Sequence, residues 1–268
     1  MGSVLVEYLQ ANQYQHQNFE GDINDELALK KAFEDFKPEI VIHLVGIVKE
    51  KPPQVTFDKI HVAGTQAVTA VAKDFEVKKI IYVSALGADP ASPVPYYRTK
   101  GQAENIIKAS EISYTILRPS LMFGKGAGFT NQLVEQMKKL PFIPILGKGE
   151  SKFQIVAVDV TAECIAKAIE LAVSDNKTYD IVGPETLTLE DITHRLAEQL
   201  KLSKHVVHLP LALLRFYANL ERVGLPTAIT GDQISMIQGG SEGDGSAMQA
   251  DFSPPTIAFD PRGKYPLY

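Results

Sequence analysis

Apolar residues recur along the chain with two patterns, which predict an alternation of buried strands and amphipathic helices. Nearly continuous β-branched and apolar runs over 40–45, 79–84 and 114–117 are typical of strands buried on both faces of a sheet. Segments whose apolar residues have the spacing of an amphipathic helix lie before, between and after these runs. They are 3–12, the segment after Asp25, 55–75, 96–110, 159–173 and 189–200. The alternation predicts an α/β fold with a doubly wound parallel sheet.

The regular alternation breaks down after Pro119. A Gly-rich loop at 124–128, a Pro-punctuated stretch at 141–149 and a strand at 153–158 follow. We therefore expect a first domain over 1–160. The last sheet elements are expected to interleave with a small C-terminal α/β subdomain over 161–238. Residues 239–268 have the Gly and Pro content of a flexible tail.

Composition narrows the class of protein. The 268 residues carry 27 Lys plus Arg and 32 Asp plus Glu, a formal net charge of −5, which disfavours nucleic acid as a partner. The single cysteine indicates a reducing compartment, and the six histidines show no spacing typical of a metal site. No signal peptide and no apolar run of the ~18 residues that a membrane span needs are visible. The pattern predicts a cytoplasmic protein.

Three candidate groups follow predicted strands, where ligands bind in a doubly wound sheet. Ser84 ends the second strand, Tyr96 and Lys100 share one face of the next helix, and Ser120 lies in the turn after the third strand. A neighbouring ammonium is expected to lower the pKa of a phenol, so Tyr96 becomes a candidate acid and base. A hydroxyl at Ser84 is placed to polarise a substrate oxygen, and Lys100 to hold a ribose hydroxyl. A Tyr-x-x-x-Lys spacing occurs by chance in a chain of this composition, and the order of the elements is what supports it.

The motifs together resemble the short-chain dehydrogenase/reductase superfamily, in its extended or atypical NAD(P)-dependent epimerase/dehydratase branch. Within it, the chain is most similar to the group related to the 39 kDa accessory subunit of respiratory complex I. The resemblance spans about 2–240. The segments that carry it are 21–23, 41–46, 62–65, 81–85, 96–100 with Glu104, 117–120 and 183–185.

The resemblance implies a Rossmann fold, an NAD or NADP cofactor and particular site residues. Ser84, Tyr96 and Lys100 are implied as the catalytic trio. His61 stands where the family commonly has Asn, so a proton relay at this position stays open. The implied cofactor-binding residues are Asp22 and Ile23 beside the adenine, Leu44, Val45 and Gly46 along the nucleotide, Val83, and Pro119 and Ser120 near the nicotinamide.

The family's opening strand and its Gly-x-x-Gly-x-x-Gly turn have one counterpart here, Gly2, which aligns with the last glycine. We therefore expect an N-terminally incomplete nucleotide-binding domain with a weakened or lost cofactor site. The segment that selects NAD or NADP is also expected to be missing. Organellar targeting by an upstream segment stays open for the same reason.

Two functions are compatible with these residues. One is an NAD(P)-dependent oxidoreductase or epimerase/dehydratase acting on a small-molecule carbonyl, sugar-like or quinone-related ligand. The other is a non-catalytic nucleotide-binding or assembly module, associated with a respiratory complex or a membrane surface. The apolar helix at 211–223 could face such a membrane, although core packing is the favoured interpretation.

Overall fold

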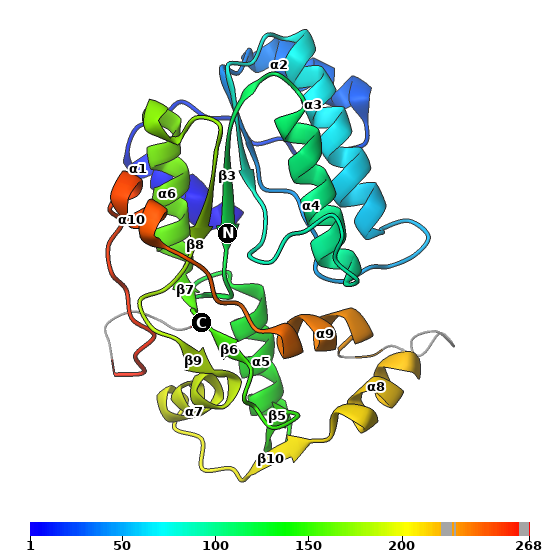
Figure 1. Cartoon of the computed structure of the whole chain (residues 1–268), viewed down its shortest axis with the longest axis vertical. Coiled ribbons are helices and arrows are strands. Elements are labelled where there is room, and N and C mark those ends of the chain that lie inside the picture. Colours follow the sequence, from blue (N-terminus) through cyan, green and yellow to red (C-terminus); the bar gives the residue numbers. More distant parts are fainter. Residues whose placement is uncertain (221–226, 228, 263–267) are drawn as a thin grey trace.

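A four-stranded parallel sheet organises the computed structural model, which describes residues 1–220, 227, 229–262 and 268 (Figure 1). The strand order is β1-β2-β3-β8, and Ile42 of β1 lies opposite Ile81 of β2. This order confirms the predicted doubly wound α/β fold, because each parallel neighbour is reached through a helical crossover. The strands are β1 (Ile40–His43), β2 (Lys79–Val83), β3 (Ser113–Pro119) and β8 (Lys177–Ile181).

Helices cover both faces of this sheet (Figure 1). Successive side chains of a strand point to opposite faces. Accordingly, Ile80 and Tyr82 pack with α2, α3 and α4, whereas Ile81 and Val83 pack with α1 and α6. The helices are α1 (Gly2–Ala11), α2 (Glu26–Phe36), α3 (Gly64–Asp74), α4 (Pro95–Lys108) and α6 (Val158–Glu170), with a π-helical segment η1 (Asp58–Ala63) leading into α3.

Local sequence explains where the helices around the site begin. The Asp25 carboxylate accepts a hydrogen bond from the backbone N–H of Ala28 and caps α2. Pro95 occupies the first turn of α4, where its missing N–H costs nothing. A Cβ on Gly101 would lie 2.4 Å from the backbone nitrogen of Pro90, so glycine lets the preceding loop lie directly against α4.

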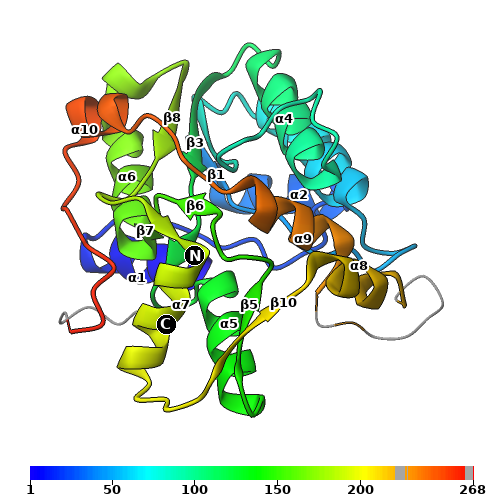
Figure 2. The same ribbon diagram turned by 60° about the horizontal axis from the view of Figure 1, so that its bottom comes forward.

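A second layer of short elements lies beyond the carboxyl ends of the strands, below the sheet in Figure 1 and turned forward in Figure 2. Its core contains a parallel pair, β5 (Ile143–Leu146) with β10 (Val206–Leu209). The strand expected over 153–158 is wrong as one element: it is split between two short strands and the start of α6. The other elements here are β4 (Met122–Phe123), α5 (Gly128–Lys139), β6 (Lys152–Phe153), β7 (Val156–Ala157), β9 (Leu187–Thr188), α7 (Leu189–Gln199), α8 (Leu211–Asn219) and α9 (Gly231–Gly239).

Helix α8 replaces the helix expected over 211–223, whose last three residues lie outside the described residues. Its inner side chain Leu214 packs against Ile234 of α9, while Leu213 and Phe216 are 58% and 67% exposed. Among the described helices, none is long and apolar enough to cross a membrane.

Residues 263–267 of the expected flexible tail lie outside the described residues. The segment over 240–262 packs on the main core, although its composition predicts a flexible tail. It contains α10 (Ser246–Phe252), and the side chains of Met248, Phe252 and Phe259 are buried in the cluster beneath the sheet. Their burial requires that this segment be ordered with the sheet.

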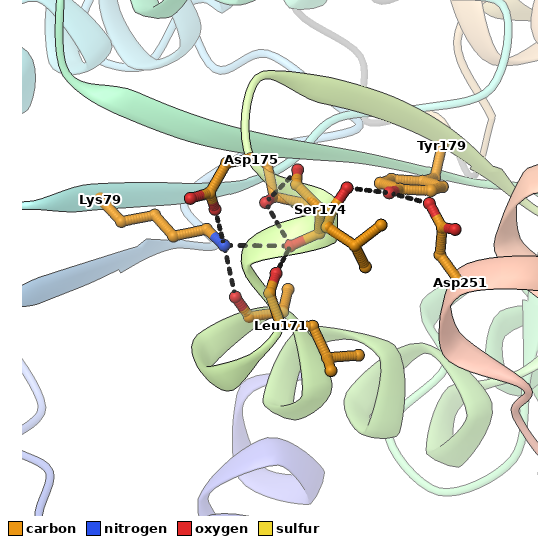
Figure 3. Close-up of polar contacts among 9 residues, drawn as sticks. Lys79, Leu171, Ser174, Asp175, Tyr179 and Asp251 are labelled. Atoms are coloured by element: carbon orange, nitrogen blue, oxygen red, sulfur yellow. Dashed lines mark hydrogen bonds and ion pairs between the residues drawn. The ribbon is translucent and has the colours of Figure 1, made fainter.

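A buried lysine closes the amino-terminal end of the sheet (Figure 3). The ammonium of Lys79, the first residue of β2, donates to the carbonyl of Ala168 at 2.6 Å and to Oγ of Ser174 at 3.0 Å. It also pairs with Asp175 at 2.5 Å, next to the short helix η2 (Ala172–Ser174). Nearby, the Tyr179 hydroxyl donates to Asp251 of α10 at 2.6 Å. These contacts hold α6 and α10 against the sheet at the end opposite the site described next.

Candidate functional site

A cavity of about 540 Å³ lies at the carboxyl ends of β1, β2 and β3. This volume and position are those expected for the ligand site of a doubly wound sheet. Ser84 follows β2, Tyr96 and Lys100 come from α4, and Ser120 follows β3, and all four line the cavity.

Eight of the residues expected from the sequence line this cavity, and four do not. Asp22 is exposed and accepts hydrogen bonds from Asn24, which lower the pKa of its carboxyl. Ile23 is buried against Gly64. Val45 and Gly2 are exposed, and a Cβ on Gly2 would lie 3.9 Å from Cδ1 of Leu44. The eight that line the cavity are Leu44, Gly46, Val83, Ser84, Tyr96, Lys100, Pro119 and Ser120.

Lys100 is buried, with 3% of its surface exposed, and its ammonium contacts a backbone carbonyl and an aromatic ring. It donates to the carbonyl of Val83 at 2.7 Å and lies 4.4 Å from the centre of the Tyr82 ring. Burial lowers the pKa of Lys100 to about 7, against a smaller opposing effect of Glu104. The lysine therefore gains and loses a proton near neutral pH.

The expectation that Lys100 lowers the pKa of Tyr96 is wrong for this structure. Burial, followed by the neighbouring Tyr97, raises the pKa of Tyr96 well above its ordinary value. The Tyr96 ring packs edge-on against Phe57 and His61, and its hydroxyl makes no hydrogen bond to any described residue. The phenol is thus protonated at neutral pH.

The hydroxyl of Ser84 donates to Oε1 of Glu104 at 2.7 Å. Glu104 is 1% exposed and receives two further hydrogen bonds from Arg118, at 2.8 and 2.6 Å, in a bidentate pair. A hydroxyl has one hydrogen to donate. Ser84 therefore cannot polarise a substrate oxygen while this contact is kept.

His61 is fully buried in η1, with both ring nitrogens hydrogen-bonded. The Ile47 N–H donates to Nε2 at 3.0 Å, and Nδ1 lies 2.9 Å from Oγ1 of Thr99. Because the Thr99 hydroxyl donates to the carbonyl of Pro95, the ring hydrogen is assigned to Nδ1. Burial, followed by the charge of Lys100, lowers the pKa of His61 to about 3. A neutral His61 positions α4 and the loop after β1.

The wall farthest from the sheet comes from residues that the sequence did not single out. They are brought together from four elements, so no local spacing reveals them. Lining residues within a single helix recur at helical spacing, as Gln132 and Gln136 do on α5, but this spacing does not show which elements meet at the cavity. The members of this distal wall are Phe129, Gln132, Leu133 and Gln136 of α5, Pro144 and Leu146 of β5, Leu189 and Thr193 of α7, and Gln233, Met236 and Ile237 of α9.

The residues around the cavity fit a dinucleotide at one end. Helix α1 begins there, since its N-cap residue Met1 lines the cavity. The first turn of a helix leaves backbone N–H groups unpaired within the helix, and these groups favour a phosphate. A Cβ on Gly46 would lie 3.5 Å from His61 and 3.6 Å from Lys100, so the glycine keeps the backbone open beside both.

A doubly wound sheet with a Tyr/Lys helix at its carboxyl edge defines a nucleotide-binding α/β protein of the short-chain dehydrogenase/reductase type. Residues 2–182 match the NAD dependent epimerase/dehydratase family, and the chain belongs to it.

Relatives and solved structures agree with this assignment. Subunit 9 of the NADH dehydrogenase [ubiquinone] 1 alpha subcomplex, mitochondrial, from Arabidopsis thaliana is 29% identical over 74% of this chain and 49% of its own length. The decarboxylating sterol-4-alpha-carboxylate 3-dehydrogenase of Candida albicans is 26% identical over 56% of this chain and 46% of its own. The chain thus spans about half the length of these curated relatives.

Among solved structures, UDP-glucuronic acid 4-epimerase of Bacillus cereus, in complex with UDP-glucuronic acid and NAD, superposes with a TM-score of 0.70. The match covers 96% of this chain and 83% of the other at 19% identity. At this identity the similarity shows the fold alone.

Proposed function

We propose that the cavity binds the nicotinamide half of NAD or NADP and that the chain is an oxidoreductase that reduces a carbonyl group. The observation that carries this proposal is the presence of Tyr96 and Lys100 in one cavity at the carboxyl edge of the sheet. The family match and the NAD in the epimerase complex support the cofactor.

Each lining residue would have a simple task toward this cofactor. The backbone of Leu44 and Gly46 would border the nucleotide, the first turn of α1 would face its phosphates, and Pro119 and Ser120 would lie by the nicotinamide. Lys100 would hold a ribose hydroxyl. The bound cofactor would supply the hydride for the reduction.

Tyr96 would supply the proton. Its raised pKa keeps the phenol protonated at neutral pH, so it suits the donor that a carbonyl oxygen needs when a hydride arrives. The direction of reaction proposed is therefore reduction. Lys100, with a pKa of about 7, is able to return a proton to the site between turnovers.

The first test is calorimetric titration of the chain with NADH and, separately, NADPH, with circular dichroism on the same sample to establish folding. We expect micromolar binding of one of them, and about tenfold weaker binding by Lys100→Met. A folded chain that binds neither dinucleotide would overturn the proposal.

The second test follows NADH or NADPH oxidation with a panel of aldehydes and ketones. Tyr96→Phe is expected to reduce turnover about 100-fold or more while leaving dinucleotide binding unchanged. Tyr114→Phe, at the far end of β3, is the matched control and should behave as the wild type. Equal turnover in the two variants would remove Tyr96 from the mechanism.

A second candidate is a non-catalytic nucleotide-binding or assembly module. The observation in its favour is that two of the candidate catalytic side chains already make hydrogen bonds within the protein. The Ser84 hydroxyl donates its hydrogen to Glu104, and the Lys100 ammonium donates to the carbonyl of Val83. The Arabidopsis relative is by name a subunit of the NADH dehydrogenase [ubiquinone] 1 alpha subcomplex. Co-purification with a membrane complex, together with no dinucleotide oxidation by any carbonyl, would favour this candidate.

A further inference from the structure

We propose that the distal wall of the cavity binds an uncharged, largely apolar molecule, such as a long-chain or polycyclic ketone, and does not bind a sugar nucleotide. The inference rests on the proposed function in one respect, that the carbonyl of this molecule is the group that Tyr96 protonates. It concerns the part of the cavity formed by α5, β5, α7 and α9 below the sheet (Figure 2).

Apolar side chains from all four elements form most of this wall. Phe129 and Leu133 come from α5, Pro144 and Leu146 from β5, Leu189 from α7, and Met236 and Ile237 from α9. Binding to such a surface is favoured in proportion to the apolar area of the ligand that it removes from water. A hydrocarbon body is therefore stabilised here, and a strongly hydrated one is not.

The distribution of charged side chains around the cavity also favours an uncharged ligand. Among the described residues that line the cavity, Lys100 is the single one with a charged side chain, and its ammonium already donates to Val83. It lies on α4, against the sheet, and not on the distal wall. A diphosphate placed on that wall would lose its hydration without gaining a cation, so its binding there is unfavourable.

Two polar side chains of the wall, Thr193 and Gln233, make hydrogen bonds within the protein. The Thr193 hydroxyl donates to the carbonyl of Leu189 at 2.7 Å. Oε1 of Gln233 accepts from the Thr230 N–H at 3.0 Å as part of the cap of α9. A sugar ring, with a hydroxyl on nearly every carbon, would leave several of these hydroxyls unpaired, whereas an apolar ketone has one oxygen to satisfy.

Binding of uncharged probes tests this assignment. Nile red, a polycyclic ketone that fluoresces in apolar sites, is titrated into the chain and then displaced by 2-undecanone or by UDP-glucose. We expect Nile red to bind, 2-undecanone to displace it, and UDP-glucose to leave it in place. Displacement by UDP-glucose and not by 2-undecanone would overturn the proposal, as would absence of Nile red binding by the folded chain.

Two lysine substitutions locate the bound probe. Met236→Lys puts a charge into the distal wall and is expected to weaken Nile red binding about tenfold or more. Leu213→Lys, on the exposed face of α8, is the matched control and should leave binding unchanged. If Leu213→Lys weakens binding and Met236→Lys does not, the probe sits on the surface of α8 and the proposal fails.

Titration with NADH and NADPH separates this inference from the proposed function. Met236→Lys is expected to bind the preferred dinucleotide as the wild type does, because Met236 lies on α9, which carries none of the residues proposed to hold the dinucleotide. One outcome is that the wild type binds Nile red, that Met236→Lys weakens this binding, and that neither dinucleotide binds. This outcome would support the apolar site and overturn the oxidoreductase proposal. If a dinucleotide binds and Nile red does not, the oxidoreductase proposal stands and the apolar site falls.

Discussion

The Ser84 hydroxyl donates to the Glu104 carboxylate, and through it Ser84 is joined to Arg118. The contact joins the end of β2 to α4 and to β3, the three elements that carry the candidate trio and the turn beside it. The serine is thus part of the framework that holds α4 against the sheet. Its expected role as a donor to substrate would require this buried hydrogen bond to break.

A double-mutant cycle measures this contact. Ser84→Ala, Glu104→Gln and the double variant are compared by urea denaturation. We expect a coupling free energy of about 2 kcal/mol, because a hydrogen bond to a charged, buried acceptor is worth more than a neutral one. Additive effects of the two substitutions would show that the serine and the carboxylate do not stabilise each other.

Acid should destabilise the fold below the ordinary histidine pKa. Burial, followed by the charge of Lys100, lowers the pKa of both His43 and His61 to about 3 from 6.5. Between these values the unfolded chain binds more protons than the folded chain, so the free energy of unfolding falls as pH decreases from about 6.5 toward 3. Urea denaturation at pH 7.5 and pH 5 measures this loss.

The matched pair for this test is His61→Asn and His194→Asn. His61→Asn removes one of the two buried imidazoles and should reduce the loss of stability between pH 7.5 and pH 5. His194 lies on α7 with its side chain 55% exposed, so His194→Asn should show the wild-type loss. Equal losses in all three proteins would contradict the assignment of neutral, buried His61.

The Lys79 network should contribute to stability and not to binding (Figure 3). Asp175→Asn leaves a buried ammonium without its countercharge and is expected to cost about 2–3 kcal/mol of the free energy of unfolding. Asp74→Asn, in an exposed pair with Lys30, should change stability by under ~0.5 kcal/mol. Both variants should bind dinucleotide as the wild type does, because the network lies at the amino-terminal end of β2.

The segment after Gly239 should behave as part of the core. Phe259 is fully buried against Phe123, with ring centres 5.0 Å apart. Phe259→Ala is therefore expected to lower the free energy of unfolding by about 3–5 kcal/mol. Phe216→Ala, the same change at an exposed position of α8, should cost under ~1 kcal/mol. Similar small effects would show that the segment is not packed in solution.

The sequence predicted the sheet well because its signals are local. Unbroken apolar runs such as the one ending at Ser84 indicate strands buried on both faces, and the helices between them force parallel neighbours. The placement of Tyr96 and Lys100 at one cavity also follows from their order along the chain, since the carboxyl ends of parallel strands meet at one edge.

The hydrogen bonds, packing and pKa values at the site depend on residues that are distant in the sequence. The sequence could not show that the Ser84 hydroxyl is hydrogen-bonded to Glu104, or that the Tyr96 ring packs among Phe57, His61 and Tyr97, because these contacts depend on packing between distant elements. It predicted a lowered pKa for Tyr96, whereas burial raises it. Likewise, the Gly-rich and Pro-rich composition after Gly239 did not indicate that Phe252 and Phe259 pack in the main hydrophobic core.

Periodicity and chain order were enough to predict the fold class and the edge of the sheet that carries the candidate site, because the amino-acid pattern contains both. The protonation states of Tyr96, Lys100 and His61 and the apolar character of the distal wall follow from the folded chain. Those properties arise from desolvation and from side chains of α5, β5, α7 and α9 that meet only when the chain is folded.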